Sequence, residues 1–188
     1  MYLAYGKAIA QKVVEHHMAN GGVSRFEKFR IYHESFLGIK LTSEEIESMS
    51  KKFSDLVLSK VVACPYIPGV VDFIRKSQST YTHFVISGTP HDEMNEIIQR
   101  RNIARYFQGI MGSPKTKSQW IKELTKKKMI EVESCVFIGD ATTDYNAAKD
   151  TGTKFILREV DYNKELFLDY SGVRVQDFKS FEKIIEAL

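Results

Sequence analysis

From Pro65 onward the chain alternates short apolar runs with helical patterns, and this alternation constrains its fold more than any other feature. Runs with the composition of buried strands are residues 82–86, 135–138 and 154–157, with weaker ones at 109–112 and 173–175. Helices are expected over residues 70–74, 94–98, 118–128, 144–150 and 181–188. Apolar strands that alternate with helices predict an α/β fold, in which helices cover both faces of a parallel sheet.

The N-terminal third of the chain carries helical patterns only. Apolar residues recur at helical spacing in three stretches, with breaks at Asn20-Gly21-Gly22 and at Gly38. Thr42 followed by Glu45 is a capping-box pattern and predicts the start of the third helix. The change of pattern predicts two domains: a helical one, residues 1–64, and an α/β one, residues 65–188.

The composition excludes several classes of protein. Hydrophobic residues make up 43% of the 188 residues and charged residues 27%, the balance of an ordinary globular protein. A net charge of +3 is too small to indicate nucleic-acid binding. Cys64 and Cys135 alone make no disulfide framework, no leader pattern opens the chain, and no stretch approaches the roughly 18 apolar residues of a membrane span. We expect a cytoplasmic protein that binds neither nucleic acid nor membrane, with no indication of its oligomeric state.

Polar residues gather where the predicted strands end. Because ligands of open parallel sheets lie at the carboxyl ends of the strands, we expect these residues to meet on one edge. In chain order they are Ser87, Gly88, Thr89, Lys115, Lys117, Asp140 and Asp144. Each also has a purely structural interpretation, as a turn or cap residue, a first-turn helix acid or a solvated lysine.

Together these side chains match the needs of phosphoryl chemistry. A hydroxyl and backbone amides bind phosphate oxygens, an ammonium offsets negative charge, and two carboxylates hold a hard cation such as Mg²⁺. The two lysines are alternatives for the ammonium. Lys117 is favoured over Lys115 because it lies where the following helix begins.

The same residues resemble motifs of the haloacid dehalogenase (HAD) superfamily, mostly magnesium-dependent phosphatases that act through a phosphoaspartate. His-Phe-Val-Ile-Ser-Gly-Thr at 83–89 resembles its second motif, and Gly-Asp-Ala-Thr-Thr-Asp at 139–144 resembles its fourth, GDxxxD. The third motif is a lysine ahead of a helix. The resemblance, which runs from about Pro68 to Leu157, implies catalytic roles for Ser87 and Lys117, substrate binding by Gly88 and Thr89, and a magnesium site at Asp140 and Asp144.

The helical N-terminal domain resembles the cap that one HAD subclass inserts after its first strand, a subclass that includes phosphoglycolate phosphatase and β-phosphoglucomutase. In such enzymes the cap closes over the phosphate site. Arg25, in the turn after the first helix, is therefore a candidate contact for an anionic group of the substrate, with an ordinary surface arginine as the alternative. The resemblance implies a small phosphorylated metabolite as substrate.

The first motif of the superfamily, a strand that ends in Asp-x-Asp, is absent from the 188 residues. The resemblance assigns to it the nucleophile, the general acid/base and a principal magnesium ligand. We therefore expect near-zero activity and at most weak Mg²⁺ binding. The missing strand also lies at the centre of the superfamily's sheet, between the strands that end at Ser87 and Asp140, so we expect a compromised or rearranged sheet.

Two explanations of the missing motif stay open. The chain is a truncated phosphatase, which we favour because the other motifs are in good order. The alternative is a natural protein that has lost catalysis and works as a HAD-like binding or regulatory protein.

Overall fold

The computed structural model describes residues 1–127 and 129–188, so the last position of the helix expected over 118–128 lies outside the described residues. The α-helices are α1 (Lys7–Ala19), α2 (Arg25–Leu37), α3 (Ser43–Ala63), α4 (Val70–Lys76), α5 (His91–Arg100), α6 (Lys117–Lys126), α7 (Thr142–Thr151) and α8 (Phe181–Glu186). The strands are β1 (Phe84–Pro90), β2 (Gly109–Ser113), β3 (Val136–Gly139), β4 (Lys154–Arg158) and β5 (Val173–Val175). Short 3-10 turns are η1 (Tyr2–Tyr5), η2 (Ser77–Ser79), η3 (Ala104–Tyr106), η4 (Val132–Ser134) and η5 (Lys164–Phe167).

The N-terminal helices α1 to α3 form a bundle, and the chain breaks between them at the predicted Asn20-Gly21-Gly22 and Gly38. Thr42 and Glu45 form both hydrogen bonds of the capping box, 2.8 and 3.2 Å long, at the start of α3. Gly38 ends α2 in the left-handed conformation at φ +69°, which glycine adopts without a Cβ penalty. The first helical pattern is interrupted, because Gly6 at φ +98° separates η1 from α1. The bundle buries its own core of Tyr2, Phe29, Tyr32 and Ile46.

All strand pairs are parallel, and helices cover both faces of the sheet, as the alternating pattern predicts. Adjacent strand residues point to opposite faces. On β4, Ile156 packs in a core cluster with Phe73 of α4 and Phe181 of α8. Its neighbour Phe155 packs on the other face against Tyr145 of α7, with ring centres 5.5 Å apart. The α/β fold class is confirmed.

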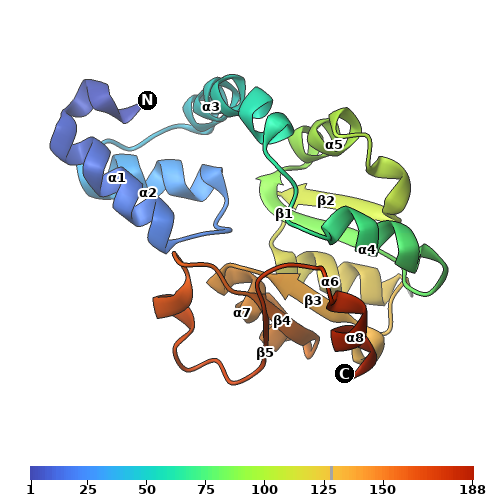
Figure 1. Cartoon of the computed structure of the whole chain (residues 1–188). Helices are drawn as coiled ribbons and strands as arrows, with labels where there is room; N and C mark the ends of the chain where they lie inside the picture. The colour runs from blue at the N-terminus through green and yellow to red at the C-terminus, as the bar shows by residue number, and fades with distance from the viewer. Residues whose placement is uncertain (128) are drawn as a thin grey trace.

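The sheet is in two pieces, as the missing central strand leads us to expect. One piece has the order β1-β2 and the other the order β3-β4-β5. Across residues 1–127 and 129–188, no strand pairing joins β1 to β3. Figure 1 shows the two pieces beside each other with helices around them.

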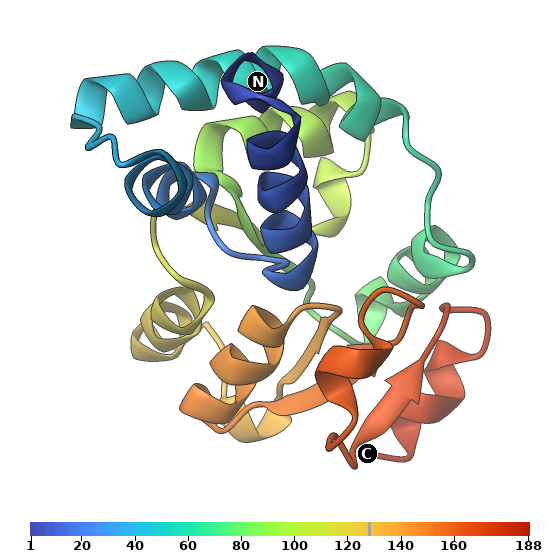
Figure 2. The ribbon, with the colours of Figure 1, turned by 90° about the vertical axis from the view of Figure 1, so that its left-hand side faces the viewer.

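The loop between α1 and α2 lies between the two pieces at the carboxyl ends of the strands. Thr143, which follows β3, donates a 3.4 Å hydrogen bond to the carbonyl oxygen of Gly21. A Cβ on Gly88 of β1 would lie only 2.5 Å from the carbonyl oxygen of Gly22. Figure 2 shows α1 directed toward the α/β part, so that this loop reaches it. A loop of the bundle, rather than another strand, therefore contacts both pieces at this edge.

The division of the chain at residues 64 and 65 stays a prediction, although α3 ends at Ala63 and the α/β pattern begins with α4. Within the described ranges, no helix is long and apolar enough to cross a membrane.

Replacing Phe181 by alanine should lower the free energy of unfolding by about 3–5 kcal/mol, because its ring is 1% exposed and leaves a cavity between α4 and β4. Urea unfolding measures this loss. Leu168→Ala is the control, because that side chain is 77% exposed and its loss should change stability by about 0.5 kcal/mol or less. Similar losses in both variants would contradict the assigned core.

Candidate functional site

A buried ion pair occupies the centre of the candidate site. Lys117 is the first residue of α6, after β2, and Asp144 lies in the first turn of α7, after β3. The Lys117 ammonium forms an ion pair with Asp144 Oδ1, and the side chains are only 10% and 8% exposed. Asp144 Oδ2 accepts a 3.0 Å hydrogen bond from the backbone N–H of Ala141. Both carboxylate oxygens of Asp144 are therefore engaged.

Ser87, Gly88 and Thr89 lie within β1 rather than after it. Between Ile86 and Pro90 the register of β1 shifts against β2, so these three residues form a bulge. Bulges release residues from the ladder and redirect their side chains. Ser87 Oγ accepts a 3.1 Å hydrogen bond from the N–H of Thr89, which closes a local turn.

Asp140 follows β3 and is the more exposed of the two acids, at 40% of its side chain. Its Oδ2 accepts a 2.8 Å hydrogen bond from the Tyr162 hydroxyl and lies 3.6 Å from the Arg158 guanidinium. Partial burial and the Asp140 carboxylate raise the pKa of Tyr162 to about 12, so the hydroxyl keeps its proton and donates. No hydrogen bond from the described residues engages Asp140 Oδ1.

Asp140 and Asp144 do not together form a complete magnesium site. The described residues contain no group of three or more His, Cys, Asp or Glu side chains placed to hold a metal. Asp140 offers one open oxygen, whereas Asp144 is committed to Lys117 and Ala141. Mg²⁺ is commonly held by one or two carboxylates together with substrate phosphate oxygens and water. Asp140 is therefore the residue that fits such an ion.

The structure directs Lys115 away from this centre. Its ammonium pairs with Glu123 of α6 and lies 4.3 Å from the centre of the Trp120 ring. Hydrogen bonds from Lys115 and Lys127 lower the pKa of Glu123 to about 2. Of the two candidate lysines, Lys117 is the one that the structure brings to Asp144.

Arg25 has a buried partner in the α/β part. Its guanidinium forms a bidentate pair with Glu93 of α5, at 2.7 and 2.8 Å, and donates a 2.8 Å hydrogen bond to Ser54 Oγ of α3. The planar fork of arginine matches a carboxylate in this way. Arg25 therefore joins α2, α3 and α5, and both terminal nitrogens of its guanidinium already have acceptors.

Sequence reasoning missed three residues that shape the site. Glu93 is buried although it lies on a polar helix, and its distant partners Arg25 and Ser54 explain this. Asn163 is fully buried and donates to the carbonyl oxygens of Asp140, at 2.8 Å, and Arg158, at 3.0 Å, which ties β3 to the segment after β4. Tyr162, beside it, contacts Asp140. Their contacts with Arg25 and with Asp140 join residues far apart in sequence, so no local motif marks them.

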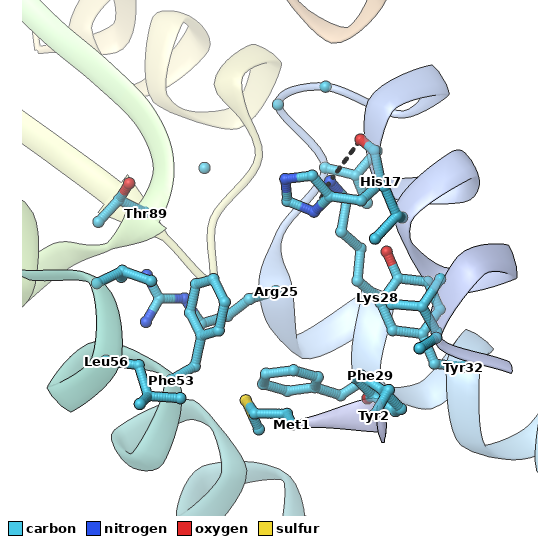
Figure 3. Close-up of a pocket in the computed structure, with 18 of the residues that line it drawn as sticks. Met1, Tyr2, His17, Arg25, Lys28, Phe29, Tyr32, Phe53, Leu56 and Thr89 are labelled. Atoms are coloured by element: carbon cyan, nitrogen blue, oxygen red, sulfur yellow. Dashed lines mark hydrogen bonds between the residues drawn. The ribbon is translucent and has the colours of Figure 1, made fainter. Parts of the chain in front are cut away.

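A cavity of about 820 Å³ adjoins the β1 bulge. The helices α1, α2 and α3 form most of its wall, and Ser87, Gly88 and Thr89 close one end. Figure 3 shows Thr89 on one side of this cavity, with His17 and Lys28 opposite. The bundle and the candidate phosphate-binding residues thus line the same cavity.

The motifs and the fold agree with a comparison against protein families. The family described as haloacid dehalogenase-like hydrolase matches residues 4–158, which includes both the bundle and most of the α/β part. The chain belongs to the haloacid dehalogenase-like hydrolase family. The resemblance drawn from the motifs is confirmed.

Solved HAD structures share its fold. A β-phosphoglucomutase from Clostridium difficile is 19% identical, with a TM-score of 0.74 over 98% of this chain and 87% of that one. A predicted phosphoglycolate phosphatase from Haemophilus somnus 129PT is 17% identical, with a TM-score of 0.70 over 94% and 87%. A HAD-hydrolase from Bacillus subtilis, bound to magnesium, is 14% identical, with a TM-score of 0.66 over 97% and 81%. No curated protein matches the chain.

In this HAD-family chain, Asp144→Asn should lower the free energy of unfolding by about 3–5 kcal/mol, because it leaves the buried Lys117 ammonium without a carboxylate. Chemical denaturation measures the loss. Asp150→Asn, at an exposed position of the same helix, is the matched control; the amide oxygen can still accept the 3.1 Å hydrogen bond from Ser118 of α6, so the change should cost about 0.5 kcal/mol or less. Equal effects would show that the pair does not hold α6 to α7.

Glu93→Gln should loosen the contact between α2 and α5, because the buried Arg25 guanidinium loses its counter-charge; we expect a loss of about 3 kcal/mol or more. Hydrogen exchange of the α2 and α5 amides should accelerate. Glu96→Gln removes an exposed pair with Arg100 on the same helix and should have almost no effect. Unchanged exchange in Glu93→Gln would refute the joining role of Arg25.

Proposed function

We propose that this chain is a HAD phosphatase scaffold that binds a small phosphorylated metabolite, and that its 188 residues bind this ligand without turning it over. Ser87 and Lys117 hold the phosphoryl oxygens, with Gly88 and Thr89 supplying backbone N–H groups. Asp140 is the carboxylate for a magnesium ion, which would offset phosphate charge when bound.

The observation that carries this proposal is the meeting of Lys117, the β1 bulge and the end of β3 at one edge of the parallel strands. The loop at Gly22 contacts all three: a Cβ there would lie 2.8 Å from Lys117 Nζ, and its carbonyl oxygen adjoins Gly88. An ammonium and a bulged hydroxyl segment this close suit a phosphate group. HAD neighbours named for phosphoglycolate and phosphoglucose chemistry support the same ligand class.

The lack of turnover follows from what the carboxylates already do. Phosphoryl transfer needs a nucleophile in line with the leaving oxygen, separate from the groups that clamp the phosphate. Asp144 is held by Lys117 and Ala141, and Asp140 by Tyr162 and Arg158. With no Asp-x-Asp in the sequence, the motif's nucleophile and acid/base are both missing.

A binding or regulatory protein is the second candidate function, and the Gly21-Gly22 loop favours it. This loop lies against Lys117, Thr143 and Gly88, so phosphate binding has to displace or rearrange it. A ligand that moves the loop also acts on α1 and α2 directly. Phosphate binding would then change the position of the bundle.

The test compares the chain with a fusion that adds an apolar strand ending in Asp-x-Asp before Met1. We expect the 188-residue chain to bind inorganic phosphate in calorimetry and to leave p-nitrophenyl phosphate intact. The fusion should hydrolyse this ester in the presence of Mg²⁺, and Asp140→Asn in the fusion should abolish hydrolysis.

Each result decides one point. Failure of the unmodified chain to bind phosphate would overturn the proposed site. Hydrolysis by the unmodified chain would overturn the proposed lack of turnover. A fusion that folds and binds phosphate but stays inactive would favour the binding or regulatory function.

A further inference from the structure

The cavity next to the β1 bulge is positively charged. Among the described residues that line it there is no aspartate or glutamate. Its ionisable basic residues are His17, Arg25, Lys28 and Lys60. The rest of the wall is largely apolar, with Phe29 and Phe53 among the larger side chains. A cationic space with apolar walls suits an anionic ligand.

Of these basic residues, Lys28 is buried without a carboxylate partner among the described residues. Arg25 is paired with Glu93, and Lys60 lies on α3 with an exposed side chain. Lys28 is 5% exposed, and in the described part of the chain it forms no ion pair with a carboxylate. Its contacts are with His17, 3.4 Å to Nδ1 and 3.5 Å to the carbonyl oxygen.

The Lys28 ammonium therefore has at least one N–H donor that no described residue engages. An ammonium carries three N–H donors, and both His17 contacts are long. Burial lowers the pKa of Lys28 to about 8, so most of the side chain still carries its charge at pH 7. Burial also lowers the pKa of His17, which leaves its ring neutral and able to accept a hydrogen bond. An anion beside Lys28 would offset the cost of burying this charge.

The Tyr32 hydroxyl is a second, independent indication of a ligand-binding site in this cavity. It lines the same cavity, is 3% exposed, and its hydroxyl has no hydrogen-bond partner among the described residues. Burial raises its pKa to about 12, so the hydroxyl keeps its proton as a donor. Figure 3 shows Lys28 and Tyr32 side by side on the wall formed by α1 and α2. Buried polar groups are normally satisfied, so an acceptor is expected here.

We propose that Lys28 and Tyr32 form an anion subsite for a second acidic group of the substrate, a carboxylate or a second phosphate, at the end of the cavity away from the β1 bulge. The assignment to a substrate rests on the proposed function. The single cavity runs from Ser87 to Lys28, so one molecule can place its phosphoester at one end and its other anion at the other. The apolar wall between the two ends of the cavity accommodates a short carbon chain.

The test follows backbone amide resonances of the full chain by NMR while inorganic phosphate, or malonate as a carboxylate probe, is added. Resonances of α1 and α2 around His17, Lys28 and Tyr32 should shift separately from those of the β1 bulge. Lys28→Met should weaken the α1–α2 response about tenfold or more, since a charge-assisted contact is lost. Tyr32→Phe, which removes only the hydroxyl, should weaken it severalfold.

The controls separate this proposal from the proposed function. Lys12→Met removes an exposed lysine of α1 outside the cavity and should leave the response unchanged. Ser87→Ala should weaken only the response of the β1 bulge. Binding of either probe at α1 and α2 that depends on Lys28 supports the subsite, even if the fusion hydrolyses nothing. No response of α1 and α2 to either probe, or a response that Lys28→Met and Tyr32→Phe leave intact in folded protein, would overturn it.

Discussion

The buried ion pair between Lys117 and Asp144 is the constraint on which the α/β part depends. Among the described strands no ladder joins the β1-β2 piece to the β3-β4-β5 piece, so strand hydrogen bonds do not hold β1 beside β3. Lys117 begins the helix after β2, and Asp144 lies in the helix after β3. Their contact joins the two pieces where a central strand would otherwise pair with both. The same contact occupies a carboxylate that the HAD motif assigns to metal binding.

The bundle is attached to the α/β part through two different kinds of contact. Arg25 and Glu93 form a buried, bidentate link between α2 and α5. The Gly21-Gly22 loop approaches by backbone, and it comes so close to Thr143 and Gly88 that a side chain would not fit at Gly22 or at Gly88. The Arg25–Glu93 pair fixes the bundle against the α/β part. The Gly21-Gly22 loop, in contrast, occupies the edge of the parallel strands where phosphate is proposed to bind. Under the proposed function, phosphate binding at this edge would therefore be coupled to the position of the bundle.

Much of the site could be predicted, because its residues follow strands whose pattern is local. Ser87, Lys117, Asp140 and Asp144 were recognisable from the order of motifs, and the structure brings Lys117 to Asp144. The side chains that these candidate residues contact in the structure could not be predicted from the sequence. Arg25 was a candidate for substrate contact, yet Glu93, 68 residues away, holds its guanidinium. No role could be assigned to Lys28 and Tyr32 from the sequence, since only the packed bundle shows that among the described residues one has no carboxylate partner and the other no acceptor.

The sequence by itself determined the helices, the parallel strands, the caps at Gly38 and Thr42, and the family. These depend on periodicity and turn chemistry among neighbouring residues. The missing motif already predicted a disrupted sheet, but only the tertiary structure decided that it forms two separate pieces, that a bundle loop lies at its edge, and that a cavity lined by basic residues adjoins the β1 bulge. These features depend on which distant groups become buried together, and burial sets the cost of leaving a charge or a hydrogen bond unpaired.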